Sequence, residues 1–146
     1  MKLAIYVAGC GIVLAACSSA DSSSTVKPST VYEQYNEKVI RGLSYEEEKS
    51  YYTESRQADM EQKIPQYMQQ MKKSREQVIQ MSQQVSQSAA RCKKIHLSQE
   101  RIEANTAYLI YEQTDRCNPQ SSHAQKQSVL MQNEQGWKIH QVEITI

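Results

Sequence analysis

The chain has 146 residues and an almost balanced charge, with 17 Lys and Arg against 16 Asp and Glu. This length suits a single domain once a targeting segment is set aside. Because no basic excess is available to neutralise a phosphate backbone, the composition argues against nucleic acid as a partner. Two of the four glycines lie in the first eleven residues, which excludes a glycine-rich phosphate loop from the rest of the chain.

The first residues have the pattern of a bacterial targeting signal. Lys2 is followed by an apolar run over residues 3–16, which is too short to span a bilayer because spanning takes about 20 apolar residues. Residues 14–17 read LAAC and resemble the bacterial lipobox, in which the cysteine receives lipid and becomes the first mature residue. A second such string ends at Cys10 but leaves a very short apolar run. The alternative is an ordinary signal peptide with a chance cysteine at Cys17.

We therefore predict a lipoprotein signal peptide over residues 1–16, with acylated Cys17 binding the protein to membrane lipid. By resemblance to enterobacterial sorting rules, Ser18 favours the outer membrane. The expected location is the bacterial cell envelope, with the protein anchored to the outer membrane and facing the periplasm. Residues 17–30 are Ser-rich and predict a flexible tether, and residues 31–146 predict one α+β domain.

The first half of this domain has helical signals. Strings typical of a capping box begin at Thr30, Ser44 and Ser74, each with a Glu or Gln three residues on. They predict a helix from residue 31 to the glycine at 42, and a short helix from residue 45 to about 53. The run Glu46–Glu48 is typical of a solvated helix face.

Residues 58–90 continue the helical period in a Gln-rich stretch. Met60, Ile64 and Met68 recur at steps of four, and the apolar stripe continues to residue 85. A methionine stripe of this kind usually fills a core, although a promiscuous binding groove is the alternative. Pro65 predicts a break or kink beside it, and the Ser74 capping string predicts a second break near Lys73.

The second half changes to short alternating runs typical of strands. These runs cover residues 95–97, 106–111, 129–131 and 137–146, with turn signals between them. They predict a four-stranded antiparallel meander. The apolar positions before and after His140 have opposite parity, which predicts a β-bulge near that residue.

Two cysteines remain after Cys10 leaves with the signal and Cys17 takes lipid. Cys92 and Cys117 lie at equal distances from the predicted turn at residues 103–105, so they should face each other across a hairpin. In an oxidising compartment this predicts a disulfide. The alternative is a reactive or metal-binding pair, but no Cys-x-x-Cys or His-x3-His spacing supports it.

The order of helices followed by a meander is similar to the nuclear transport factor 2-like superfamily, in particular its small secreted bacterial members. Residues 136–139 (GWKI) before the last strand and residues 105–107 (NTA) opening the second carry this resemblance, over residues 31–146. It implies an α+β cone, also described as cystatin-like, in which a curved antiparallel sheet wraps a long helix and leaves a pocket. Dimerisation through the sheet is common in that family, so a homodimer is an open expectation.

The residues that enzymes of this family would need are poorly represented. Asp59 reads as a helix cap and Asp115 as a turn residue, and the three histidines are scattered over three strands. The aromatic residues Tyr108, Tyr111 and Trp137 are candidates to line a pocket, with core packing as the simpler interpretation of the tyrosines.

Three hypotheses about function follow, in order of preference. The first is a non-catalytic interaction or accessory module with an envelope protein as its partner. The second is a carrier of a small apolar ligand in the cone pocket. The third is an isomerase- or hydrolase-like enzyme. We predict the first, with no metal, no cofactor and no catalytic residues.

Overall fold

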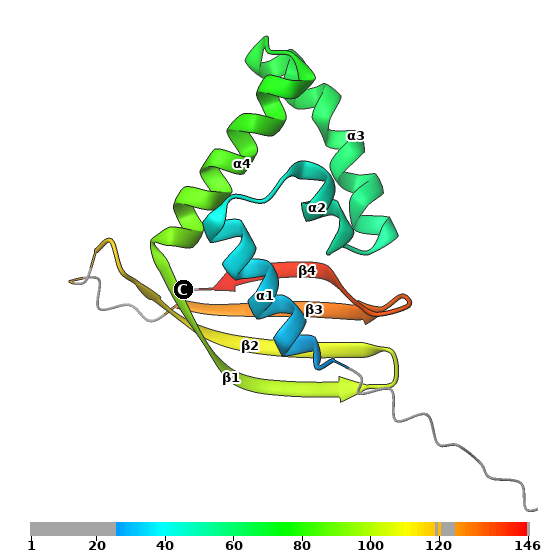
Figure 1. Ribbon diagram of the computed structural model, residues 1–146, viewed down its shortest axis with the longest axis vertical. Coiled ribbons are helices and arrows are strands. Elements are labelled where there is room, and N and C mark those ends of the chain that lie inside the picture. Colours follow the sequence, from blue (N-terminus) through cyan, green and yellow to red (C-terminus); the bar gives the residue numbers. More distant parts are fainter. Residues whose placement is uncertain (1–25, 119, 121–124, 146) are drawn as a thin grey trace, which may run out of the picture.

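The computed structural model describes residues 26–118, 120 and 125–145. Within these residues, four helices precede four strands, and the predicted α+β class with a four-stranded antiparallel meander is confirmed (Figure 1). The elements are α1 Pro28–Arg41, α2 Tyr45–Ser50, α3 Glu54–Met71, α4 Arg75–Arg91, β1 Lys93–Glu103, β2 Thr106–Asp115, β3 Gln125–Asn133 and β4 Trp137–Thr145. The predictions for the signal peptide, Cys17 and His123 concern residues outside those described.

The sheet has the strand order β1-β2-β3-β4, and α1 lies across one of its faces (Figure 1). Alternate strand residues point to this face, so Ala107 and Leu109 of β2 are almost fully buried while Tyr108 between them is exposed. The main core forms where α1 and the α2–α3 connection meet this face. It consists of Tyr32, Tyr52, Ala107, Leu109, Tyr111, Val129, Met131 and Ile139.

Two irregularities change the register of the sheet. In β4, Ile139 pairs with Met131 and Gln141 pairs with Leu130, so His140 is the extra residue of a bulge, as predicted. In β1, a second bulge lies between Leu97 and Gln99. This second bulge was not predicted, although the apolar positions change parity across it, from Ile95 and Leu97 to Ile102.

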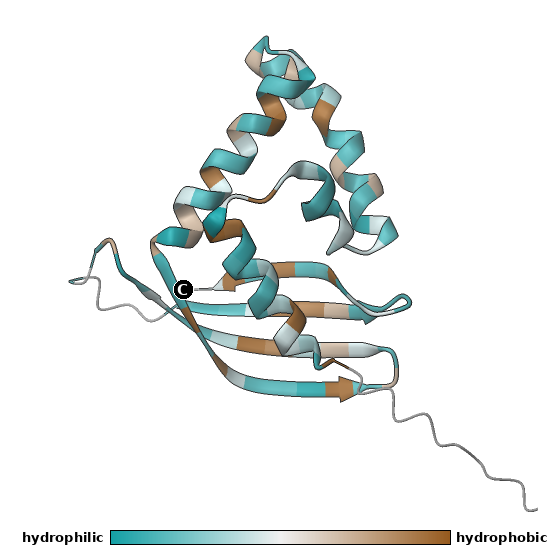
Figure 2. Ribbon diagram, viewed as in Figure 1, coloured by the Kyte–Doolittle hydropathy of each residue, from teal (hydrophilic) through white to brown (hydrophobic). Residues whose placement is uncertain are grey.

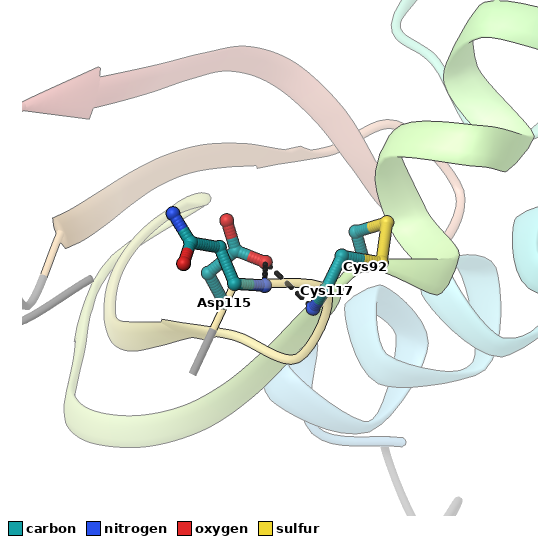
Figure 3. The surroundings of a disulfide bond; sticks show 4 residues. Cys92, Asp115 and Cys117 are labelled. Carbon is teal, nitrogen blue, oxygen red and sulfur yellow. Dashed lines mark hydrogen bonds between the residues drawn. A yellow bond between two sulfur atoms is a disulfide. The ribbon is translucent and has the colours of Figure 1, made fainter. Parts of the chain in front are cut away.

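The predicted disulfide between Cys92 and Cys117 is present, with 5.0 Å between the two Cα atoms (Figure 3). It joins the end of α4 to the chain just after β2. The backbone amides of Cys117 and Asn118 donate to Asp115 Oδ1 at 2.8 and 3.0 Å, so Asp115 closes a turn at the strand end, as predicted. The β1–β2 hairpin is therefore closed at its open end by a covalent bond.

Two of the three predicted helix caps are confirmed. Ser44 and Ser74 each form a complete capping box, at the start of α2 and α4. The prediction at Thr30 is wrong, because α1 begins at Pro28 and Thr30 lies within its first turn. Pro28 and Ser29 are buried, so the folded domain begins three residues before the predicted start at residue 31.

The predicted break at Pro65 is also wrong, because α3 runs through this residue to Met71. Pro65 is exposed, so the carbonyl that loses its helical partner can be hydrated, and the buried neighbour Ile64 fixes this turn against the fold. The second predicted break is confirmed at Lys72, which takes a left-handed conformation with φ 53°. The chain reverses there and α4 returns towards the sheet.

The two longest helices extend away from the sheet (Figure 1). The family resemblance implies a long helix inside the curve of the sheet, but the shorter α1 occupies that position. The α2–α3 connection runs beside β4, where Thr53 N donates to Ile139 O at 3.1 Å and Ile139 N donates to Tyr51 O at 2.7 Å. These bonds cover part of an edge strand that would otherwise be free to pair with another chain.

Candidate functional site

The helices α3 and α4, with residues 72–74 between them, form a helical arm that extends from the sheet. The two helices meet at Lys72 and diverge towards the sheet, and α2 lies between them (Figure 1). The start of α1 lies beside β1, where Ser29 N donates to Glu100 Oε1 at 3.0 Å. This is the edge of the sheet away from the tip of the arm (Figure 1). The arm therefore points away from the place where the chain enters the domain.

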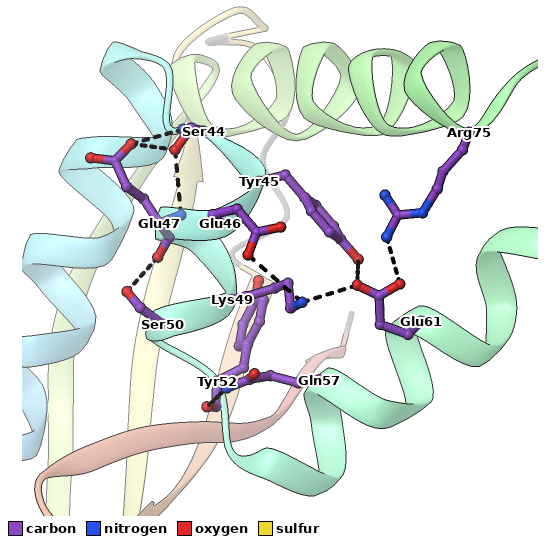
Figure 4. Close-up of polar contacts among 10 residues, drawn as sticks. All are labelled: Ser44, Tyr45, Glu46, Glu47, Lys49, Ser50, Tyr52, Gln57, Glu61 and Arg75. Carbon is purple, nitrogen blue, oxygen red and sulfur yellow. Dashed lines mark hydrogen bonds and ion pairs between the residues drawn. The ribbon is translucent and has the colours of Figure 1, made fainter.

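A cluster around Glu61 braces the arm on α2 (Figure 4). Glu61 of α3 accepts hydrogen bonds from Arg75 of α4 at 2.6 Å, from Lys49 of α2 at 3.0 Å and from Tyr45 Oη at 3.1 Å. The Arg75 and Lys49 cations lower the pKa of the Glu61 carboxyl to about 2. One carboxylate thus connects three helices.

Large apolar side chains are exposed on this arm. Tyr67 and Met71 lie one turn apart on α3, and Met81 and Val85 lie one turn apart on α4, with exposed fractions between 38% and 69%. Figure 2 shows the hydrophobic residues of α3 and α4 as separate bands among hydrophilic turns. The predicted methionine stripe is therefore only partly core, because its members near the tip of the arm face solvent.

A groove of about 270 Å³ separates α3 and α4. Both helices contribute apolar residues to its lining, and its charged residues all come from α3. The lining includes Met60, Ile64, Tyr67, Val78, Ile79 and the charged residues Arg56, Asp59 and Lys63. Asp59 is not the helix cap that was predicted: it lies inside α3 and accepts from Lys63 Nζ at 2.7 Å.

The three aromatic residues predicted as pocket candidates do not come together. Tyr111 is fully buried in the core under α1. Tyr108 lies on the opposite face of the sheet, with the Arg101 guanidinium 4.7 Å from its ring centre, in a shallow hollow of about 340 Å³. Trp137 is half-buried at the start of β4 against the edge of the core. Residues three apart in a strand face opposite sides, which separates the two tyrosines.

The tyrosine-rich side of α1 forms a hydrogen-bonded network. The hydroxyls of Tyr35 and Tyr52 lie 2.5 Å apart, and both donate to Glu48 Oε1, at 3.3 and 3.0 Å. Burial raises the pKa of Tyr52 to about 12 and raises the pKa of Tyr35 further. Both phenols are therefore neutral hydrogen-bond donors at physiological pH.

The candidate catalytic residues are dispersed. His96 lies on β1 and His140 on β4, at opposite edges of the sheet. His140 Nδ1 lies 3.2 Å from Thr53 Oγ1 and 3.4 Å from Ser55 Oγ. The nearby carboxylate of Glu134 accepts from the backbone amide of Glu54 at 3.0 Å and not from His140. Among the residues described, no group of three His, Cys, Asp or Glu side chains is placed to hold a metal ion.

Comparison with known proteins gives no relative: no protein-family model, no curated protein and no solved structure matches this chain. Within the described part of the chain, none of the helices combines the length and the hydropathy that a membrane span requires.

Proposed function

We propose that the protein is a lipid-anchored module of the bacterial cell envelope that binds a protein partner through its helical arm and has no catalytic role. The observation that carries this proposal is the set of large apolar side chains exposed on the arm. Four of the eight such side chains in the described residues belong to it, namely Tyr67, Met71, Met81 and Val85. A concentration of exposed apolar side chains on one part of a fold is typical of an interaction surface.

The position of the arm also supports this role. The chain enters the domain beside β1, and the tip of the arm faces away from that point. If Cys17 holds the N-terminal end at a membrane, the tip of the arm is therefore directed away from the anchored end. The arm is braced through Glu61 and carries methionines, whose flexible side chains adapt to varied partner surfaces. The side of the sheet under α1 is filled by core residues such as Leu109 and Met131, which supports the interaction role over ligand carriage there.

The proposal is tested by site-specific photocrosslinking in cells that produce the full chain. A photoreactive residue at Met71 or Val85 should yield one discrete crosslinked protein. The same residue at Thr114, which is exposed on the sheet, should not. Addition of Tyr67→Glu should abolish the crosslink from Met71, which lies one turn away on α3, because a carboxylate in the apolar surface opposes burial.

Anchoring is measured separately by intact mass and membrane fractionation. Wild type should carry three acyl chains and sediment with the outer membrane, and Cys17→Ser should be released into the soluble periplasmic fraction. Equal crosslinking from Met71, Val85 and Thr114, or crosslinks that persist in Tyr67→Glu, would contradict the proposed role of the arm. Membrane association of Cys17→Ser would contradict the lipid anchor alone.

A further inference from the structure

A polar groove of about 260 Å³ lies on the other side of α4, beside the end of α1. Its lining includes Val39 and Leu43 as apolar members, Glu48 of α2, and several glutamines of α4, among them Gln83 and Gln87. This groove is distinct from the apolar groove of the arm, which lies between α3 and α4. Its chemistry follows from how these polar groups are already bonded.

The two glutamine side chains use their amide nitrogens on the backbone. Gln83 Nε2 donates to Leu43 O at 2.8 Å, and Gln87 Nε2 donates to Ile40 O at 3.2 Å. A backbone carbonyl accepts only from the NH₂ side of an amide, so these contacts fix which side of each glutamine is the donor. The amide oxygens remain as acceptors.

Glu48 adds a carboxylate that has no cation partner among the residues the structure describes. Its Oε1 accepts from the hydroxyls of Tyr35 and Tyr52, whereas its Oε2 has no hydrogen-bond partner among the described residues. Within the same part of the chain, no Lys, Arg or His nitrogen lies within 4 Å of this carboxylate. A half-buried carboxylate held by two neutral donors keeps its negative charge available to a ligand.

The end of α1 adds to the negative potential of the groove. A helix carries partial negative charge at its C-terminus, and α1 ends at Arg41 beside the groove. The cations of its last turn are engaged elsewhere: the Lys38 ammonium lies 5.3 Å from the Tyr51 ring centre, and Arg41 pairs with Glu37 at 3.6 Å. Arg91 of α4 donates from Nε to Ile40 O at 3.2 Å and offsets part of the helix-end charge, so the Glu48 carboxylate is the main negative group of the groove. The groove therefore combines acceptors and apolar surface with one unpaired carboxylate.

We propose that this groove binds a primary ammonium group carried on an aliphatic chain. The ammonium has three donors and no acceptor, which matches Glu48 Oε2 and the glutamine oxygens. The methylene groups of the ligand lie against Val39 and Leu43. A free diamine and a lysine side chain of a peptide share this chemistry. The site is independent of the proposed role of the helical arm.

Isothermal titration calorimetry with the purified full-length protein tests the site. The probes are 1,5-diaminopentane, Nα-acetyl-lysine amide and, as the uncharged control, 1-pentanol. Both ammonium probes should bind and 1-pentanol should not. Binding of the diamine alone would support the site and assign it to free diamines, and binding of both would extend it to lysine side chains.

Two variants locate the binding. Glu48→Gln should weaken ammonium binding by about tenfold or more, because a charge-assisted hydrogen bond is lost, and Glu46→Gln on the same helix should leave it unchanged. Gln84→Lys places a tethered ammonium at the groove without touching the tyrosine network, so it should also abolish binding. Ser88→Lys adds the same charge to an exposed position of α4 outside the lining and serves as its control.

The proposal is overturned if neither ammonium probe binds the wild-type protein at millimolar concentration. It is equally overturned if 1-pentanol binds as well as the diamine, or if Gln84→Lys and Ser88→Lys bind the diamine alike. Because Gln84→Lys leaves Glu48 and its tyrosine partners intact, loss of folding in Glu48→Gln would not remove the test.

Discussion

Replacing Glu61 with glutamine tests whether one carboxylate holds the helical arm against α2. The partners are partly exposed, with 36% of the Glu61 side chain, 21% of Lys49 and 41% of Arg75 open to solvent. Exposed ion pairs contribute about 0.2–1 kcal/mol each, and screening places these two pairs and the hydrogen bond from Tyr45 in the lower part of that range. We therefore expect Glu61→Gln to lower the free energy of unfolding by about 1 kcal/mol at neutral pH.

The pH dependence of this effect has a definite sign. The pKa of Glu61 is lowered from 4.5 to about 2 in the folded protein. The unfolded chain therefore takes up a proton on this group first as the pH falls. The stabilisation is fully present above about pH 5 and is lost between that pH and the folded pKa. The difference between wild type and Glu61→Gln should shrink towards zero as the pH approaches 2.

Urea unfolding of both proteins at several pH values measures this difference. Glu46→Gln is the matched control, because Glu46 contacts the same Lys49 at 3.8 Å but is 80% exposed, and its effect should be within about 0.3 kcal/mol. Amide hydrogen exchange should also rise in α3 and α4 more than in the sheet. A difference between wild type and Glu61→Gln that stays constant down to about pH 2.5 would refute the charge-based brace.

Three further outcomes are expected. Replacing Cys92 and Cys117 with serine should lower the free energy of unfolding by about 3 kcal/mol in the chain-entropy model, and dithiothreitol should lower the melting temperature of wild type but not of this variant. Leu109→Ala should destabilise by about 3 kcal/mol in chemical denaturation, whereas Tyr108→Ala on the exposed face should cost about 1 kcal/mol or less. Burial raises the pKa of Tyr52 to about 12, so its contribution to the free energy of unfolding is present below about pH 10 and is lost between about pH 10 and pH 12. Tyr52→Phe should therefore reduce the pH dependence of stability in this range, measured by alkaline unfolding followed by tyrosinate absorbance.

Local signals predicted the elements whose causes lie within a few residues. Ser44 and Ser74 cap their helices through bonds to residues three positions on, so a four-residue string contains the whole interaction. The bulge at His140 follows from a change of parity within one strand. The disulfide follows from two cysteines equidistant from a turn, because a hairpin relates positions by simple counting.

The failures occur where a distant residue determines the local structure. Thr30 has the sequence of a cap, yet α1 begins earlier because Pro28 suits the first helical position and Glu100 of β1 accepts from Ser29 N across 71 residues. α3 continues through Pro65 because Ile64 beside it is buried. In each case tertiary contacts outweigh a local preference of about 1–3 kcal/mol.

The candidate sites were harder to predict because their members come from separate helices. Glu61 meets Lys49 and Arg75 at separations of 12 and 14 residues, and no periodic pattern marks such a convergence. The pocket aromatics were chosen by residue type, although Tyr108 and Tyr111 differ in strand parity and that difference alone separates them. Parity was the available signal, and applying it would have assigned only one of the two to the core face.

The three consecutive glutamates of α2 show how a uniform pattern separates in the fold. Successive residues of a helix point about 100° apart, so the run predicted as one solvated face divides among three environments. Glu46 is exposed, Glu47 completes the capping box with Ser44, and Glu48 turns inward to the tyrosines and the polar groove. Because α2 contributes Lys49 to the arm and Glu48 to the groove, this short helix contacts both proposed sites. Glu48→Gln therefore perturbs the groove and Glu61→Gln perturbs the arm, although the two changes affect neighbouring residues of α2, Glu48 and Lys49.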